Sequence, residues 1–126
     1  MKLCVLASAF TVCKIDDAVP VDLNVPYTFL SRTHEERSLV CPTWAVPEQT
    51  LEREDGWRAF YVDGVLDFSL IGILVRISGV LAEEKIGLFA VSTYNTDYIL
   101  TKADRFGDAL AALQKAGYEV EQAPAV

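Results

Sequence analysis

The sequence of 126 residues predicts an α+β fold in which short strands and helices share a hydrophobic core. From residue 57 onward, apolar residues switch between the two-residue period of strands and the 3.6-residue period of helices. The composition, with 52% hydrophobic and 23% charged residues, is that of a globular chain. The length allows one compact domain or two very small ones.

The second half of the chain contains six predicted elements. Strands are expected at residues 57–62, 86–93, 98–102 and 118–121. The first helix is expected after the N-cap Ser69, with an apolar stripe at Leu70, Ile73, Leu74, Ile77 and Leu81. The second is expected between Asp104 and Gly117, with a stripe at Phe106, Leu110 and Leu113. This βαββαβ order predicts a ferredoxin-like unit with a four-stranded antiparallel sheet and both helices on one face.

The first half predicts a reduced, β-rich version of the same unit. A long strand is expected at Lys2–Ile15, and a hairpin joins residues 27–32 to residues 36–40. Pro20 and Pro26 exclude a long helix between these strands, and a short helical turn is expected within residues 47–54. The turn signal Asp55-Gly56 then divides an N-terminal subdomain, residues 1–56, from a C-terminal domain, residues 57–126.

Composition argues against several classes of function. A net charge of −7 with scattered basic residues disfavours nucleic-acid binding. The longest apolar stretch contains Asp67 and Arg76, so no membrane span is expected. Three cysteines without a metal-ligand spacing, Cys4, Cys13 and Cys41, indicate buried thiols in a cytoplasmic protein.

The sequence offers no catalytic set. The single histidine, His34, is expected at an exposed hairpin tip without an acidic partner. The acidic pairs at residues 52–55 and 83–84 are expected on solvated surfaces. Because no phosphate-binding, dinucleotide-binding or zinc-protease motif is present, we expect no enzyme, metal or cofactor.

Gly72 lies at the beginning of the first predicted helix, where a glycine is costly by about 1 kcal/mol relative to alanine. Its missing Cβ permits close approach of a ligand to the free N–H groups of the first turn. The hairpin Ser92–Asp97 supplies hydroxyls, carbonyls and a carboxylate, so the two segments together suit a zwitterion. A tightly packed helix start beside an Asx-type turn explains the same residues equally well.

Three segments resemble an ACT domain, and the similarity is greatest to the small tandem-ACT proteins grouped with aspartate kinase regulatory regions and the CASTOR arginine sensors. The segments are residues 70–77, residues 81–88 and the run Val91-Ser92-Thr93-Tyr94-Asn95-Thr96-Asp97-Tyr98-Ile99-Leu100. Residues 33–41 resemble the corresponding segment of the first unit in that branch. Arg37 departs from the pattern, where an apolar residue is usual, and Thr101 replaces a usual valine.

The resemblance implies a regulatory domain in which an amino acid lies between two ACT units. Main-chain contacts are expected at Ile71, Gly72, Ile73 and Leu74, and the other wall is expected at Thr93, Tyr94, Asn95, Thr96 and Asp97. An equivalent site in the first half would use Glu36 and Ser38. We therefore expect a cytoplasmic, homodimeric amino-acid sensor that reports to a protein effector. The alternative is an interaction module that has lost its ligand and serves dimerisation or effector binding.

Overall fold

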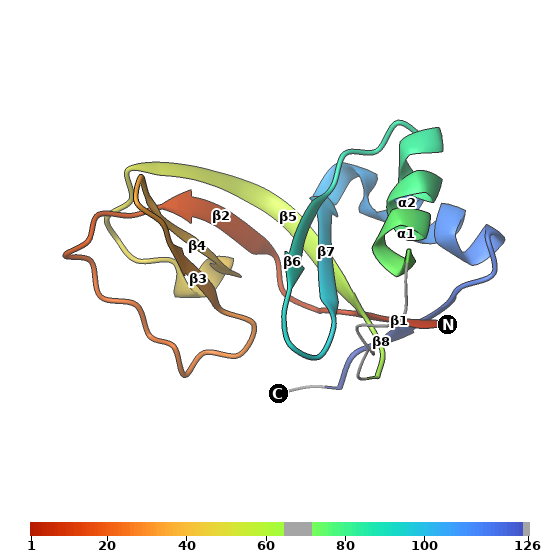
Figure 1. Ribbon diagram of the computed structural model, residues 1–126, viewed down its shortest axis with the longest axis horizontal. Coiled ribbons are helices and arrows are strands. Elements are labelled where there is room, and N and C mark those ends of the chain that lie inside the picture. The colour runs from red at the N-terminus through yellow and green to blue at the C-terminus, as the bar shows by residue number, and fades with distance from the viewer. Residues whose placement is uncertain (65–71, 125–126) are drawn as a thin grey trace. The chain divides into compact units, whose positions relative to one another are not determined.

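The computed structural model describes residues 1–64 and 72–124 and divides the chain into two compact units (Figure 1). The C-terminal unit comprises Met1–Ala7 together with the chain from Arg58 onward. The N-terminal unit comprises Ser8–Trp57. No helix within the described ranges is long and apolar enough to cross a membrane.

The C-terminal unit is a sheet with two helices. Its strands are β1 (Lys2–Val5), the second half of β5 (Glu52–Val62), β6 (Phe89–Ser92), β7 (Asp97–Lys102) and β8 (Glu119–Gln122), in the order β6-β7-β5-β1-β8. Its helices are α1 (Ile73–Glu83) and α2 (Ala103–Lys115). Pairing is antiparallel between β6 and β7 and between β1 and β5, whereas β1 and β8 are parallel.

Both helices pack on one face of this sheet. Alternate strand residues face them, as the period of a strand requires: Leu3 and Val5 on β1, Phe60 and Val62 on β5, and Ile99 on β7. The helices contribute buried side chains at helical spacing: Ile73, Ile77 and Leu81 on α1, and Phe106, Ala109 and Leu113 on α2. The predicted α+β class and the placement of both helices on one face are confirmed.

The N-terminal unit is a small antiparallel sheet. Its strands are β2 (Phe10–Lys14), β3 (Phe29–Arg32), β4 (Arg37–Pro42) and the first half of β5. Residues Cys13, Ile15, Leu39 and Cys41 form the buried core on one face of this sheet. Within Ser8–Trp57, which the structure describes completely, the one helical element is the 3-10 turn η1 (Thr43–Ala45).

The first predicted strand, Lys2–Ile15, is wrong as a single element. The structure interrupts it after Val5 and begins β2 at Phe10, and these two strands belong to different units. In the C-terminal unit β1 lies between β5 and β8, so its sheet has five strands rather than the expected four, and one pair is parallel. Burial of Leu3 and ion pairs from Lys2 to Asp63 (3.5 Å) and Glu121 (3.2 Å) hold β1 there.

The predicted helical turn within residues 47–54 is also wrong, because β5 already begins at Glu52. The Asp55-Gly56 signal does not end an element but lies inside this strand. The pairing of β2 with β5 shifts by one residue at this point, and Gly56 has a φ of 85°. A glycine with positive φ is typical of a β-bulge, which kinks a strand without ending it.

The helix starts differ from the predictions at a few positions. Ser69 and Leu70 lie outside the described residues, and α1 has Gly72 as its N-cap. The N-cap of α2 is Lys102, and Asp104 lies in the first turn instead, where its charge is favourable. Ala109 is fully buried on α2, whereas the expected stripe residue Leu110 is only partly buried.

Candidate functional site

The turn between β6 and β7 is built by its own hydroxyl groups. The backbone N–H of Thr93 donates to the carbonyl oxygen of Thr96 at 2.9 Å. Thr93 Oγ1 donates to the same oxygen at 3.0 Å and accepts the Thr96 N–H at 3.4 Å. At the base of the turn, Ser92 Oγ donates to Asp97 Oδ1 at 2.7 Å. The side chains of Ser92 and Thr93 therefore fix the conformation of the turn.

Thr96 anchors this turn to the end of β5. Its Oγ1 donates to the carbonyl oxygen of Val62 at 2.6 Å, and its side chain is buried. The hydroxyl groups of Thr93 and Thr96, which were expected to line a ligand, thus have hydrogen-bond partners within the protein. Tyr94, at 80% exposure, and the exposed Asn95 form the tip of the turn.

The beginning of α1 has the features of an anion-binding helix terminus. Gly72 is in the left-handed conformation with a φ of 83°, and its carbonyl oxygen accepts the Arg76 N–H at 2.8 Å. The N–H groups of the first turn lie before that bond and have no partner within the helix. A Cβ on Gly72 would lie 3.3 Å from Arg76 Nη1, so this guanidinium is next to the helix start.

The expected α1 residues differ in what they can offer a ligand. The Ile73 side chain is buried in the core and Leu74 packs against it, so their main chains are the available groups. Ile71 lies outside the described residues. Arg76, whose charge adds to the positive end of the helix, was not among the expected site residues. Its position four residues after Gly72, one turn along a helix, was the available signal.

The turn between β3 and β4 in the N-terminal unit has the same hydrogen-bond pattern as the turn between β6 and β7. Thr33 N–H donates to Glu36 O at 2.8 Å, Thr33 Oγ1 donates to the same oxygen at 3.4 Å, and the Glu36 N–H donates to Thr33 Oγ1 at 3.1 Å. The same three hydrogen bonds join Thr93 and Thr96, which lie sixty residues later in the chain. The two hairpins therefore use one turn geometry, with His34 exposed at the tip of the first.

Glu36 and Ser38 line a groove on the N-terminal unit with a volume of about 600 Å³. Lys14 lies in the same groove and is opposite Ser38 on β4 and Glu52 on β5 in the strand register. The other lining residues are Val12, Cys13, Glu35, Arg53 and Glu54. The two expected residues of this unit are therefore brought into one groove, in a unit separate from Gly72 and Asp97.

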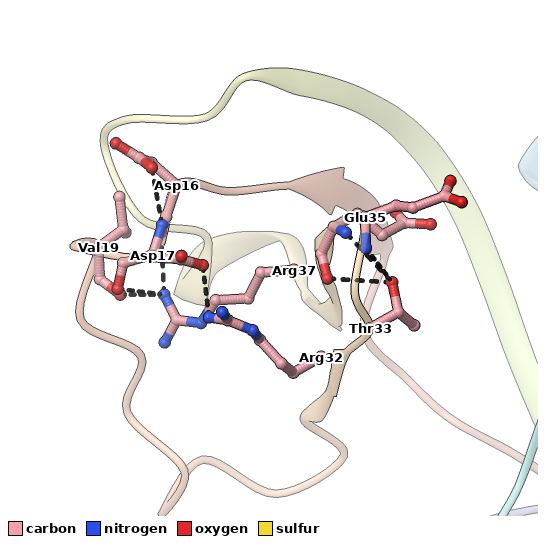
Figure 2. Close-up of polar contacts among 8 residues, drawn as sticks. Asp16, Asp17, Val19, Arg32, Thr33, Glu35 and Arg37 are labelled. Atoms are coloured by element: carbon pink, nitrogen blue, oxygen red, sulfur yellow. Dashed lines mark hydrogen bonds and ion pairs between the residues drawn. The ribbon is translucent and has the colours of Figure 1, made fainter.

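Arg37 has a structural role that accounts for the departure from the family pattern. Its Nη1 donates to the carbonyl oxygens of Val19 (2.6 Å), Asp16 (3.0 Å) and Asp17 (3.4 Å), as Figure 2 shows. The neighbouring Arg32 pairs with Asp17 Oδ1 at 2.6 Å. The loop after β2 is thus fastened to the β3–β4 hairpin by two arginines.

The cysteines do not provide a nucleophile. All three are buried and free, and burial raises the pKa of each thiol. For Cys41 burial raises the pKa to about 11, with a smaller contribution from Cys13. A protonated thiol is a poor nucleophile and a poor metal ligand. In residues 1–64 and 72–124, no group of three or more His, Cys, Asp or Glu side chains is placed to hold a metal ion.

Comparisons with known proteins agree with this architecture. The sequence profile of the ACT domain matches residues 52–115. No curated protein matches the chain. Protein Atu0741 from Agrobacterium tumefaciens is similar in structure, with a TM-score of 0.84, 23% identity, and coverage of 98% of this chain and 94% of that one.

Two further solved structures are more distant. The aspartate kinase of Clostridium acetobutylicum has a TM-score of 0.61 at 15% identity, covering 90% of this chain and 33% of that chain. The ligand-free regulatory subunit of aspartate kinase from Thermus thermophilus has a TM-score of 0.58 at 9% identity, covering 93% and 97%. At these identities the likeness concerns the fold.

Proposed function

Because the chain belongs to the ACT-domain family, we propose that it is a non-enzymatic regulatory module that binds an amino acid. ACT domains are regulatory ligand-binding modules, and the Thermus thermophilus neighbour is a regulatory subunit. The observation that carries the proposal is the turn between β6 and β7, which Thr96 anchors to Val62 O at 2.6 Å. An anchored turn presents its tip and Asp97 in one fixed arrangement, which lowers the entropic cost of binding a small ligand.

In this proposal, protein groups of opposite charge bind the carboxylate and the ammonium group of the ligand. Its carboxylate meets the N–H groups of Gly72, Ile73 and Leu74, where the helix terminus and Arg76 supply positive potential. Its ammonium group meets Asp97, whose Oδ1 is held by Ser92 and whose Oδ2 can still accept. In this proposal Tyr94 and Asn95 line the ligand, while Thr93 and Thr96 support the turn.

The test is thermal unfolding of the full chain against each of the twenty amino acids. A ligand at about 100 times its Kd stabilises a protein by roughly 2.7 kcal/mol, so one amino acid should raise Tm by several degrees. Asp97→Asn should abolish that rise, and the matched surface variant Asp108→Asn should keep it, because Asp108 is exposed on α2. A chain that responds to none of the twenty contradicts the proposal.

We also propose that the module pairs with a second copy and reports to a protein effector. A regulatory domain without chemistry of its own acts by changing a contact with another protein. Light scattering after size exclusion, with and without an amino acid that raises Tm, measures this directly. A monomer at all concentrations contradicts the pairing.

A further inference from the structure

The hairpins of the two units correspond at a constant offset of sixty residues. Strands β6 and β7 begin and end sixty residues after β3 and β4, respectively. Leu39 on β4 is therefore the equivalent of Ile99 on β7. Ile99 faces the helices of the C-terminal unit, and Leu39 belongs to the buried core of the N-terminal unit. The core face of the N-terminal unit thus corresponds to the sheet face that α1 and α2 cover in the C-terminal unit.

This face of the N-terminal unit is covered by loops instead of helices. Helix α2 begins directly after β7, and η1 begins directly after β4, but η1 ends at Ala45. Pro47 explains the early end, because a helix continuing from Thr43 needs an N–H at residue 47 to bond to Thr43 O. Val46 is already extended, with φ −65° and ψ 132°. The segment between β2 and β3 likewise contains no helix.

A hollow of about 360 Å³ lies between these two loops. Its walls are formed by Ala18, Val19 and Pro20 on one loop and by Pro47, Glu48 and Gln49 on the other. Arg37 holds the first wall by donating to Val19 O at 2.6 Å (Figure 2). The second loop is held at its start, where Thr43 N–H donates to Ala9 O at 2.9 Å. The hollow is therefore preformed, and all of these residues lie within Ser8–Trp57.

Both loops carry a large apolar side chain that is exposed. Trp44 is 72% exposed, although Ala45 and Val46 next to it pack on the core of the unit. Leu23 is 64% exposed on the other loop, where Val21 packs on the same core. Exposed apolar side chains beside a hollow are typical of protein–protein contacts, and tryptophan is among the side chains that contribute most to them.

The charge of the hollow indicates what kind of partner fits it. Among the described residues that line it, Asp16 and Glu48 are acidic and none is basic. Neither carboxylate pairs with a cation in residues 1–64 and 72–124. A second copy of this chain has a net charge of −7 and so fits this acidic face poorly. A partner segment with lysine or arginine beside its apolar residues is complementary to it.

We propose that this face of the N-terminal unit binds a basic amphipathic helix of a partner protein. The apolar stripe of that helix lies between the two loops, against Trp44, and its basic residues meet Asp16 and Glu48. The C-terminal unit supports the choice of a helix, because Phe106 of α2 packs on the core there and Val46, sixty residues earlier, packs on the core here. The proposal names a surface for the protein effector, and in that respect it rests on the proposed function.

Fluorescence anisotropy with labelled peptides on the full chain tests this proposal. The probe has the thirteen-residue length of α2, keeps Phe106, Ala109, Leu110 and Leu113, and has alanine and lysine at its outward positions. A hydrocarbon staple keeps so short a peptide helical. The control peptide has glutamate in place of each lysine. The lysine peptide should bind about tenfold more tightly, and the difference should shrink at high salt. Equal affinities, or no binding of either peptide, overturn the proposal.

Two pairs of variants locate the binding surface. Trp44→Ser should weaken the lysine peptide about tenfold, whereas Val75→Ser, at the same 72% exposure on α1, should not. Glu48→Lys should remove most of the preference for lysine over glutamate, and Glu83→Lys on the exposed surface of α1 should keep it. Unchanged binding in both Trp44→Ser and Glu48→Lys overturns the assignment to this face.

Two further outcomes distinguish other occupants and the proposed function. Light scattering that finds a dimer of the free chain, lost in Trp44→Ser, assigns the face to a second copy and overturns the proposal. Peptide binding by a chain that responds to none of the twenty amino acids supports this surface and contradicts the amino-acid site. A response to an amino acid without peptide binding overturns this surface alone.

Discussion

Arg37 shows how one side chain can take over the role of missing secondary structure. The N-terminal unit has no α-helix between β2 and β3, and Arg37 holds the loop in that place through three carbonyl oxygens. We predict that Arg37→Leu lowers the free energy of unfolding by about 1–3 kcal/mol, because the partly buried hydrogen bond to the Val19 carbonyl is lost together with two exposed ones. Urea denaturation measures the loss, and amide exchange of residues 16–19 should quicken.

Arg32→Leu is the matched control for this prediction. Arg32 is 63% exposed and forms a surface ion pair with Asp17, which is worth at most about 1 kcal/mol. Equal destabilisation by the two variants would show that Arg37 contributes no more to stability than the surface ion pair of Arg32 does.

The buried thiol of Cys41 makes the free energy of unfolding depend on pH in the alkaline range. Burial raises its pKa from 9.0 to about 11, so the folded state holds the thiol proton more tightly than the unfolded state. The stabilisation is complete below pH 9 and is lost as the pH rises from 9 through 11. We predict a free energy of unfolding that declines in this range under reducing conditions, with a shallower decline in Cys41→Ala. Parallel curves for the two proteins would exclude Cys41 as the source.

At the scale of elements, strongly periodic segments were predictable and long-range pairings were not. The stripe Ile73, Ile77 and Leu81 follows helical geometry, and α1 forms there. The charged sequence at Glu52 carries no strand signal, yet it becomes strand because β2 supplies a partner. β1 is likewise defined by distant strands, β5 and β8, which local periodicity does not reveal.

The candidate site was predictable to a similar extent. The glycine at a helix start and the polar hairpin indicated Gly72 and Ser92–Asp97, and the resemblance to ACT domains, confirmed by the profile match, implied a ligand between two such units. The hydroxyls of Thr93 and Thr96 were interpreted as ligand groups because the sequence does not show that Thr96 O and Val62 O accept from them. Gly72→Val would strain the backbone at its φ of 83°, so this variant would change folding as well as any ligand contact.

Replacing glycine by alanine should change stability in opposite directions at Gly56 on β5 and at Gly79 on α1. Gly56 lies at the bulge of β5 with a φ of 85°, so Gly56→Ala should destabilise the chain by about 1–2 kcal/mol, although nothing lies within 4 Å of the added Cβ. Gly79 lies on an exposed position of α1, also with open space, and Gly79→Ala should stabilise by about 0.5–1 kcal/mol. Thermal unfolding should move Tm in opposite directions. A loss in both variants would refute the conformational explanation.

At the scale of the whole molecule, the chain passes between its two units at two places, after Ala7 and after Trp57. The sequence-based boundary at residues 56 and 57 accounts for the second passage and misses the first. A fragment of residues 57–126 would therefore lack β1, which in the full chain pairs with β5 on one side and β8 on the other. We predict that this fragment does not fold, because it leaves the core face without Leu3 and Val5.

Single substitutions in the full chain test the same contribution of β1 to stability. Leu3→Ala should cost about 2–5 kcal/mol, since Leu3 is fully buried in the core of the C-terminal unit. The matched variant Leu23→Ala, in an exposed loop of the N-terminal unit, should cost less than about 0.5 kcal/mol. Urea denaturation compares the two, and the near-ultraviolet circular dichroism of fragment 57–126 reports its packing. A cooperatively folded fragment would contradict this prediction, because it would show that the C-terminal unit folds without β1.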